Sequence, residues 1–224
     1  MEQRYSRQAE VIGKKAQEKL CKSRIAVVGL GGLGCAVSLY LAAAGANLVL
    51  VDCDRVEESN LPRQVLYAEK DVGRKKTDAA ESALRERNSL IRIETIDGKV
   101  NRNTVGKMSA DVIVDCTDDD ETRFVVNERA RELGVPYVYG ACSGWAASVA
   151  VLTPEGPSLR SILRGKRTAE KGVLGPVVAV TGAMQALCAV RALVLRPKAE
   201  WLHFDAEKLE FSPVKLPKKP LKTF

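Results

Sequence analysis

Residues 25–64 contain an apolar run, a glycine-rich turn, a small apolar segment and a second apolar run in immediate succession. Residues 25–28 are apolar and rich in β-branched side chains, and the glycines that follow are spaced G-x-G-x-x-G. Residues 35–44 are small and apolar, as a buried helix would be, and residues 48–51 form a second apolar run that ends at Asp52. This order of strand, turn, helix, strand and acid is the dinucleotide-binding fingerprint in the context that it requires.

The glycines of this turn have separate physical roles. Gly29 allows the chain to turn sharply, and Gly31 and Gly32 let the backbone approach a phosphate without a Cβ atom in the way. Gly34 permits close packing of the helix on the strand. The helix N-terminus offers unpaired N–H groups and a partial positive charge to an anion. Asp52 can accept hydrogen bonds from ribose hydroxyls, so the turn predicts an adenine-nucleotide site.

The segment RVEESNLPRQ, residues 55–64, carries the polar cluster Asn60, Arg63 and Gln64. A dehydrogenase has no need of an arginine at this place, whereas a bound triphosphate does. We therefore expect ATP rather than NAD, and the alternative of an NAD-dependent oxidoreductase is disfavoured.

The remaining pattern predicts an α/β fold: a Rossmann-like, doubly wound and mostly parallel sheet with helices on both faces and an antiparallel C-terminal portion. Helices are expected over 1–20, 75–88, 101–109, 121–133 and 173–195, and strands over 91–96, 112–114, from 137, over 146–153, 201–205 and 209–214. We expect one domain, 1–224, made of a helical arm (1–20), a nucleotide-binding half (21–140), a substrate-side and dimer half (141–214) and a flexible basic tail (215–224).

Composition narrows the classes of function. The net charge of +7 fits attraction to an anionic substrate, but aromatic residues make up only 5% and no basic-aromatic stripe suggests nucleic-acid binding. No apolar run reaches about 18 residues without a charge, and the N-terminus is polar, so we expect a cytoplasmic protein without a membrane span. The six cysteines form no C-x-x-C and fit a reducing compartment, while His203, the single histidine, makes a histidine base or zinc site improbable.

At these residues the chain resembles the ThiF/MoeB/HesA family of adenylyltransferases, which are related to ubiquitin-activating enzymes. The resemblance covers nearly the whole chain in family order. The matching motifs are Arg4-Tyr5-Ser6-Arg7-Gln8, the GLGGLG turn, Asp52-Cys53-Asp54, Ser59-Asn60-Leu61-Pro62-Arg63-Gln64, Val72-Gly73-Arg74-Lys75-Lys76, Asp115-Cys116-Thr117-Asp118 and Gly172-Val173-Leu174-Gly175-Pro176.

The resemblance implies an ATP- and magnesium-dependent enzyme that activates a carboxylate as an acyl-adenylate. It assigns catalysis to Arg63, Lys76 and Asp118, the last as the residue linked to Mg²⁺. It implies a homodimer in which Arg7 reaches the nucleotide phosphates of the partner.

Other residues are assigned to nucleotide binding. These are Gly29, Gly31, Gly32, Gly34, Asp52, Asp54, Asn60 and Gln64, together with Arg63, Lys76 and Asp118. Lys75 is expected to be a neighbour of the catalytic lysine, and the acids that follow Asp118 are expected to form a turn or a helix cap.

The chain departs from many relatives in its cysteines. Ser158 and Ser161 stand where relatives have a zinc-binding C-x-x-C, and no C-terminal pair completes such a site. No cysteine lies near Thr168, where thioester- or persulfide-forming relatives carry one. Cys142 has no histidine or metal nearby in sequence to lower its pKa, so we do not expect a nucleophile there. These departures predict a zinc-free variant that passes its product to a separate thiol enzyme.

The residues leave the activated carboxylate open. One possibility is the C-terminal glycine of a ubiquitin-like sulfur carrier protein. The other is a small-molecule carboxylate, as in the relative that adenylates the guanylylpyridinol precursor of the iron-hydrogenase cofactor. A non-catalytic partner subunit is a further alternative, which the joint presence of the arginine, lysine and aspartate disfavours.

Overall fold

The computed structural model describes residues 3–163 and 172–217, and the strands in this part of the chain form one eight-stranded sheet. The sheet order is β3-β2-β1-β4-β5-β6-β7-β8. The strands are β1 (Arg24–Val28), β2 (Asn47–Asp52), β3 (Ile93–Asp97), β4 (Val112–Asp115), β5 (Tyr137–Ser143), β6 (Ala146–Leu152), β7 (Glu200–Asp205) and β8 (Glu210–Pro213).

Parallel pairing joins β3, β2, β1, β4 and β5, and antiparallel pairing adds β6, β7 and β8. The predicted mostly parallel sheet with an antiparallel C-terminal portion is therefore confirmed. Strand β1 pairs with β2 on one side and β4 on the other. The chain order reverses at this point, and doubly wound sheets bind their ligands outside the carboxyl ends of the strands at such a switch point.

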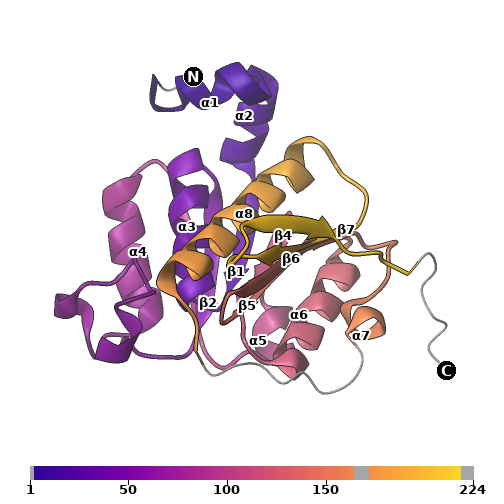
Figure 1. Cartoon of the computed structure of the whole chain (residues 1–224). Coiled ribbons are helices and arrows are strands. Elements are labelled where there is room, and N and C mark those ends of the chain that lie inside the picture. The colour runs from indigo at the N-terminus through magenta and orange to yellow at the C-terminus, as the bar shows by residue number, and fades with distance from the viewer. Residues whose placement is uncertain (1–2, 164–171, 218–224) are drawn as a thin grey trace.

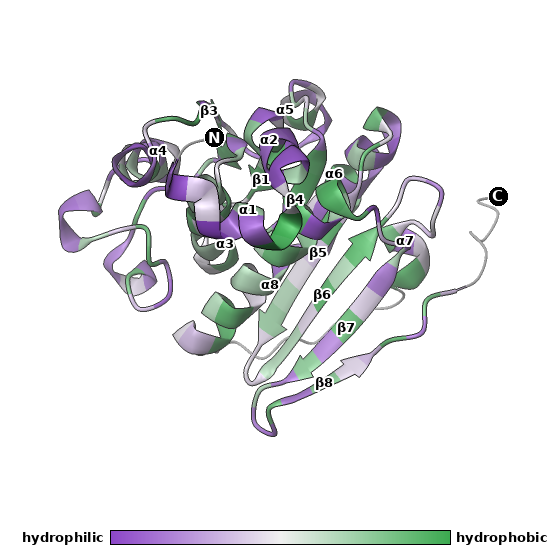
Figure 2. Cartoon of the chain, turned by 90° about the horizontal axis from the view of Figure 1, so that it is seen from above, coloured by the Kyte–Doolittle hydropathy of each residue, from purple (hydrophilic) through white to green (hydrophobic). Residues whose placement is uncertain are grey.

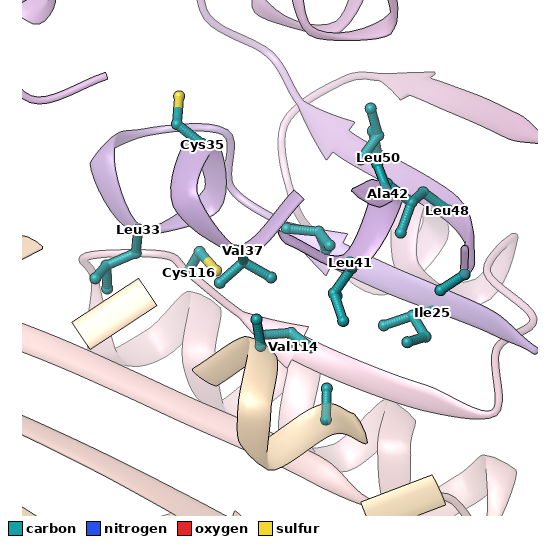
Figure 3. Packing of buried hydrophobic residues seen from close by; sticks show 14 of the residues in the cluster. Ile25, Leu33, Cys35, Val37, Leu41, Ala42, Leu48, Leu50, Val114 and Cys116 are labelled. Carbon is teal, nitrogen blue, oxygen red and sulfur yellow. The ribbon is translucent and has the colours of Figure 1, made fainter. Parts of the chain in front are cut away.

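Helices cover both faces of the sheet (Figure 1). One face holds α3 (Gly32–Ala44), α4 (Lys76–Arg87) and α8 (Gly175–Val194), and the other holds α5 (Arg102–Gly106), α6 (Asp120–Leu133) and α7 (Leu159–Ile162). Alternation along β1 supplies both cores, because Ile25 and Val27 join the first cluster while Ala26 and Val28 join the second. In Figure 3, Val37 and Leu41 of α3 lie against Val114 and Ile25 of the strands.

The long helix α8 lies across α3, close enough that a Cβ atom on Gly182 would stand 2.7 Å from the Cβ atom of Ala36. The expectation that no apolar run is long enough to span a membrane is wrong, because residues 172–190 carry no charge and α8 could cross a membrane by length and composition alone. Most of its buried apolar residues, however, belong to the same core cluster as α3 and the sheet, and 56% of its most apolar window is buried. We therefore read α8 as a core helix.

Burial falls toward one margin of the sheet. All four residues of β4 are buried, whereas all four residues of β8 are exposed. In Figure 2, β8 lies at this margin beyond β7 and is not hydrophobic along its length. Residues 215–217 of the predicted tail follow it, and residues 218–224 lie outside the described residues, as does Thr168.

The N-terminal arm differs from the single helix expected over 1–20. After a 3-10 turn at Gln3–Tyr5, it forms α1 (Ser6–Ile12) and α2 (Lys14–Lys22). Gly13 separates them with φ at +85°, a conformation that interrupts a right-handed helix. The arm docks on the last turn of α3, where the Gln8 and Gln17 amides donate to the Ala44 carbonyl at 3.2 and 3.0 Å. Most other elements follow the expected ranges closely, although the first strand after α4 begins at Ile93 instead of residue 91.

Asn88, the residue that ends α4, ties the arm to the body of the protein. Its side chain is buried, and its amide donates to the Tyr5 hydroxyl at 2.8 Å and to the Ala42 carbonyl at 2.7 Å. Its oxygen accepts from the Arg4 guanidinium and from the Leu90 N–H group. One amide thus joins the arm, α3 and α4.

We expect Asn88→Ala to lower the free energy of unfolding by about 2–3 kcal/mol, because buried partners lose their hydrogen bonds. Urea unfolding followed by circular dichroism measures this change. Asn103→Ala, an exposed asparagine in α5, is the matched control and should stay within about 0.5 kcal/mol of the wild type. Equal unfolding midpoints for the two variants would contradict this role of Asn88.

Candidate active site

The glycine turn after β1 lies against the loop after β4, at the switch point of the sheet. The Gly29 N–H group donates to the Val51 carbonyl and the Cys116 N–H group donates to the Val28 carbonyl, each at 2.8 Å. Gly29 has φ at +89°, and a Cβ atom there would stand 2.9 Å from the Cys116 carbonyl oxygen. Only glycine fits this close approach, which brings the loop containing Asp118 beside the turn.

The N-terminus of α3 is open above this turn. Gly31 is the N-cap residue and has no side chain to accept from the first N–H groups of the helix. A Cβ atom on Gly34 would stand 1.9 Å from the Gly29 carbonyl oxygen, so the first turn of α3 packs tightly against the start of the glycine turn. At Gly31 the nearest atom would be the Gln64 Nε2 atom, 4.0 Å away. The turn is therefore closely packed at Gly34 and open at Gly31, where an anion can bind to the positive end of the helix dipole.

Asp52 fastens the turn to the end of β2. Its Oδ2 atom accepts from the Leu30 N–H group at 2.5 Å, and its Oδ1 atom accepts from the Asp54 N–H group at 2.7 Å. The side chain is buried, and the structure thus places the predicted ribose-binding carboxylate at the turn. Tyr67 was not predicted, yet its hydroxyl donates to the Leu30 carbonyl at 2.8 Å and holds the turn from the other side.

The polar segment of residues 59–64 lies between the glycine turn and the start of α8. A Cβ atom on Gly32 would stand 3.3 Å from the Arg63 carbonyl oxygen, and one on Gly175 would stand 2.6 Å from the Pro62 carbonyl oxygen. The Arg63 guanidinium donates to the Ser59 carbonyl at 2.8 Å, and its side chain is half-buried. The structure thus brings Arg63 next to the turn, as expected.

Gln64 and Asn60 occupy different situations in this segment. Gln64 is buried, and its Oε1 atom has no hydrogen-bond partner among the described residues, so the amide beside Gly31 retains unused bonding capacity. The Asn60 Oδ1 atom accepts from the Glu57 N–H group at 3.2 Å and completes a capping box of the 3-10 helix Glu58–Asn60. Asn60 therefore has a structural role that the sequence did not indicate.

Lys76 lies at the first position of α4 and is paired with Asp54. The distance between Lys76 Nζ and Asp54 Oδ2 is 2.9 Å, and the lysine side chain is 7% exposed while the aspartate side chain is 63% exposed. The hydrogen bond from Lys76 lowers the pKa of Asp54 below its usual value. Lys75 is paired with Asp97 instead, at 2.5 Å. Lys76 is thus the lysine that the structure joins to the glycine turn, through Asp54 and its neighbour Asp52.

The acids after β4 differ in their contacts, and the expected helix cap is Asp119. Asp119 is the N-cap of α6 and accepts from the N–H groups of Glu121 and Thr122 at 3.2 and 3.0 Å. Asp118 is exposed, and its carboxylate forms no hydrogen bond or ion pair with any described residue. Its oxygens are therefore available to a cation.

A second group of candidate ligand atoms belongs to Asp52, Cys53 and Asp54, which lie within 4.8 Å of one another. The two aspartates are already engaged, by backbone N–H groups and by Lys76 respectively. Asp118 is the better candidate for binding a cation.

Arg7 is the predicted site residue that lies far from the glycine turn within the same subunit. It is exposed on α1, whose neighbour Gln8 bonds to the carboxyl-terminal end of α3, whereas the glycine turn is at the opposite end. The 13 residues of α3 separate these ends by ~20 Å at about 1.5 Å per residue. A cavity of about 530 Å³ also lies at the arm, lined by Gln3, Tyr5, Gln17, Glu18, Cys21, Gly45 and Leu90.

Cys142 near the end of β5 is not suited to nucleophilic chemistry. Burial raises the pKa of its thiol to about 11, despite the opposing influence of Arg123 and Arg63. A thiol with this pKa is protonated at neutral pH, and the thiolate is the reactive form. This agrees with the expectation from sequence.

Arg123, which sequence reasoning missed, reaches under the Asp118 loop. Its side chain is buried, and its Nε and Nη2 atoms donate to the Thr117 carbonyl at 3.1 and 2.7 Å. A signal existed, because Arg123 is a cation in the first turn of a helix, where it opposes the dipole and needs an acceptor.

Comparisons with known proteins agree on one family. The model of the ThiF family matches residues 5–223. The chain is 37% identical to the molybdopterin-synthase adenylyltransferase of Haemophilus influenzae, over 96% of this chain and 95% of that protein. It is 36% identical to the sulfur carrier protein ThiS adenylyltransferase of Escherichia coli, over 95% of this chain and 90% of that protein.

Among solved structures, E. coli MccB with ATP resembles this chain with a TM-score of 0.86 at 24% identity. The match covers 99% of this chain and 74% of MccB. At this level of identity the likeness shows a shared fold.

Two glycine variants should separate the roles within the turn. Gly34→Ala forces the helix off the Gly29 carbonyl and should lower the free energy of unfolding by about 1–3 kcal/mol. Gly31→Ala adds a methyl group in open space, so it should keep the melting temperature but weaken ATP binding by about tenfold or more, measured by calorimetry. Normal ATP affinity in Gly31→Ala would show that no phosphate approaches this backbone.

Proposed function

Because the chain belongs to the ThiF family and is an adenylyl-transferring enzyme like its curated relatives, we propose that it transfers AMP from ATP to a carboxylate. The products are an acyl-adenylate and pyrophosphate. The observation that carries this proposal is the meeting of three positive features at the switch point: the open N-terminus of α3, Arg63 and Lys76.

The reaction needs positive charge more than acid–base chemistry. A carboxylate oxygen attacks the α-phosphorus of ATP, the bond from this phosphorus to the bridging oxygen breaks, and pyrophosphate leaves with that electron pair. The carboxylate is already ionised at neutral pH, so no general base is required. The enzyme must hold two anions together and stabilise the charge that grows on the phosphates.

Arg63 and Lys76 supply this positive charge from two directions. The carbonyl oxygen and the Cγ atom of Arg63 lie beside Gly32 of the turn, and Lys76 lies at the first position of α4. Asp54 holds Lys76 in place before ATP binds. Gln64, beside Gly31, and Asn60 position the phosphate oxygens with their side-chain amides. Asp52 binds the ribose.

Asp118 fits a magnesium ion bound together with ATP. Mg²⁺ prefers carboxylate oxygen and is usually held by one or two carboxylates plus substrate phosphates, and Asp118 offers an exposed carboxylate without a partner among the described residues. When bound, the ion neutralises charge on the phosphates.

For the substrate we favour the C-terminal carboxylate of a ubiquitin-like sulfur carrier. Support comes from the relative named for adenylating the sulfur carrier ThiS. The high pKa of the Cys142 thiol argues that this enzyme releases or hands over its adenylate instead of forming a thioester at that residue. A separate thiol protein would then accept the activated carboxylate. Six free cysteines fit a reducing, cytoplasmic setting.

The site is completed, in this proposal, by Arg7 from a second copy of the chain. Within its own subunit Arg7 lies at the wrong end of α3. Exposed apolar side chains on α8 and α3 are suited to dimer formation, because Val180, Leu187 and Tyr40 are 41%, 58% and 57% exposed. A homodimer would bury such side chains and carry the arm to the neighbouring site.

Arg63→Ala and Asp118→Ala should each lower carboxylate-dependent ATP–pyrophosphate exchange by about 100-fold or more while the proteins remain folded. Exchange is measured with labelled pyrophosphate, with a carrier protein and small carboxylates as separate substrates. Cys142→Ser is the control and should remain within about twofold of wild type, because its thiol is protonated. If both charged residues prove dispensable, the proposed site is wrong. ATP–pyrophosphate exchange that small carboxylates support and the carrier protein does not would show that the substrate is a small molecule.

Mixing two inactive variants tests the role of Arg7 across the dimer. Arg7→Ala and Asp118→Ala homodimers should each be inactive, but an equimolar mixture that exchanges subunits should recover about one quarter of wild-type activity. In the mixed dimer, one site has an intact Asp118 and receives an intact Arg7 from its partner. Co-purification of differently tagged subunits verifies that subunits have exchanged. If the mixture then shows no more activity than the two variants alone, Arg7 does not act in trans.

A further inference from the structure

We propose that Arg123 is a positioning residue, which holds the loop after β4 in the conformation that presents Asp118 to the nucleotide and its metal. This inference rests on the proposed function, because it extends the role of Asp118. Arg123 itself does not face the open side of the site, since its side chain is only 7% exposed.

The planar guanidinium of Arg123 is committed to the backbone of this loop. Two of its nitrogen atoms, Nε and Nη2, donate to the single carbonyl oxygen of Thr117, the residue before Asp118. The Nη1 atom donates to the Tyr139 hydroxyl at 3.2 Å and to Asp120 at 3.3 Å. The guanidinium also lies over the Tyr139 ring, 5.0 Å from its centre. These partners fix the guanidinium in one orientation.

Asp115 binds the same residue, Thr117, at other atoms. Its carboxylate is fully buried and accepts from the Thr117 N–H group at 2.9 Å and from the Thr117 hydroxyl at 2.7 Å. The Tyr137 hydroxyl donates to its other oxygen. The N–H group, the hydroxyl and the carbonyl of Thr117 are therefore all held by hydrogen bonds. The next side chain, Asp118, is exposed and has no partner among the described residues.

This arrangement suits a residue that must point a carboxylate at a metal. A carboxylate on a free loop would sample many directions, and outer contacts that orient a metal ligand are worth about 10- to 100-fold in metal affinity. Lysine cannot replace the guanidinium, because its ammonium group does not donate two parallel N–H bonds to one carbonyl while it stacks on a ring. The charge beside the buried Asp115 would nevertheless be kept in Arg123→Lys, so the fold should persist.

The first measurement is hydrogen–deuterium exchange of the purified protein without nucleotide. In Arg123→Lys, peptides covering residues 116–119 should exchange about fivefold faster or more, because the guanidinium no longer holds the loop. The second is ATP binding by calorimetry with and without Mg²⁺. Arg123→Lys should lose about tenfold or more of the affinity gained from Mg²⁺, as Asp118→Ala does, and keep the metal-free affinity. In an Asp118→Ala background the lysine change should add little.

Arg129→Lys is the matched control. Arg129 is on the same helix, and its Nη2 atom also donates to backbone carbonyls, those of Gly106 and Met108, at 3.1 and 2.9 Å, but in a different loop. It should leave both measurements near wild type. The inference is overturned if Arg123→Lys leaves exchange at 116–119 unchanged, or if the loop loosens without any change in the magnesium effect. If the wild type fails to bind ATP at all, the proposed function falls, and the magnesium role of Arg123 falls with it. In that case faster exchange would show only that Arg123 holds the loop.

Discussion

The close contact between Gly34 and the Gly29 carbonyl determines where everything else in the site lies. With no room for a methyl group between them, α3 starts directly above the end of β1. The helix therefore presents its first N–H groups at the switch point of the sheet, where the loops after β2 and β4 begin. A longer or looser turn would move the positive end of the helix away from the carboxylates and cations gathered there.

Around this turn, the charged and polar side chains are oriented by contacts made before any ligand arrives. Asp52 is fixed by two backbone N–H groups, Lys76 by Asp54, and the Asp118 loop by Asp115 and Arg123. Such preorganisation lowers the reorganisation required when a triphosphate binds. Arg63 and Gln64 retain more freedom to bind, the first half-buried and the second with an oxygen lacking a partner among described residues.

The sequence predicts the first strand, turn and helix well, because glycine spacing and apolar periodicity are local signals. It also predicts that the acids after Asp118 form a turn or a helix cap, and Asp119 is the N-cap of α6. It fails where structure depends on distant partners. Asn88 meets Tyr5 across more than eighty positions, and no local pattern indicates that. The direction taken by Arg123 depends on the strands beneath α6, and the break at Gly13 interrupts a pattern that otherwise reads as one helix. The role proposed for Arg7 rests on the family resemblance, because within one subunit Arg7 lies at the opposite end of α3 from the glycine turn.

The exposed strand β8 shows how this sheet can end without a covering helix. Free edge strands invite polymerisation by pairing with other chains, and proteins counter this with short edges, charges and proline. Strand β8 has four residues, starts with Glu210 and ends at Pro213, which has no N–H group to donate. Lys215 follows closely. The margin is thus protected against self-aggregation by its own chemistry, without a further element of the described chain to cover it.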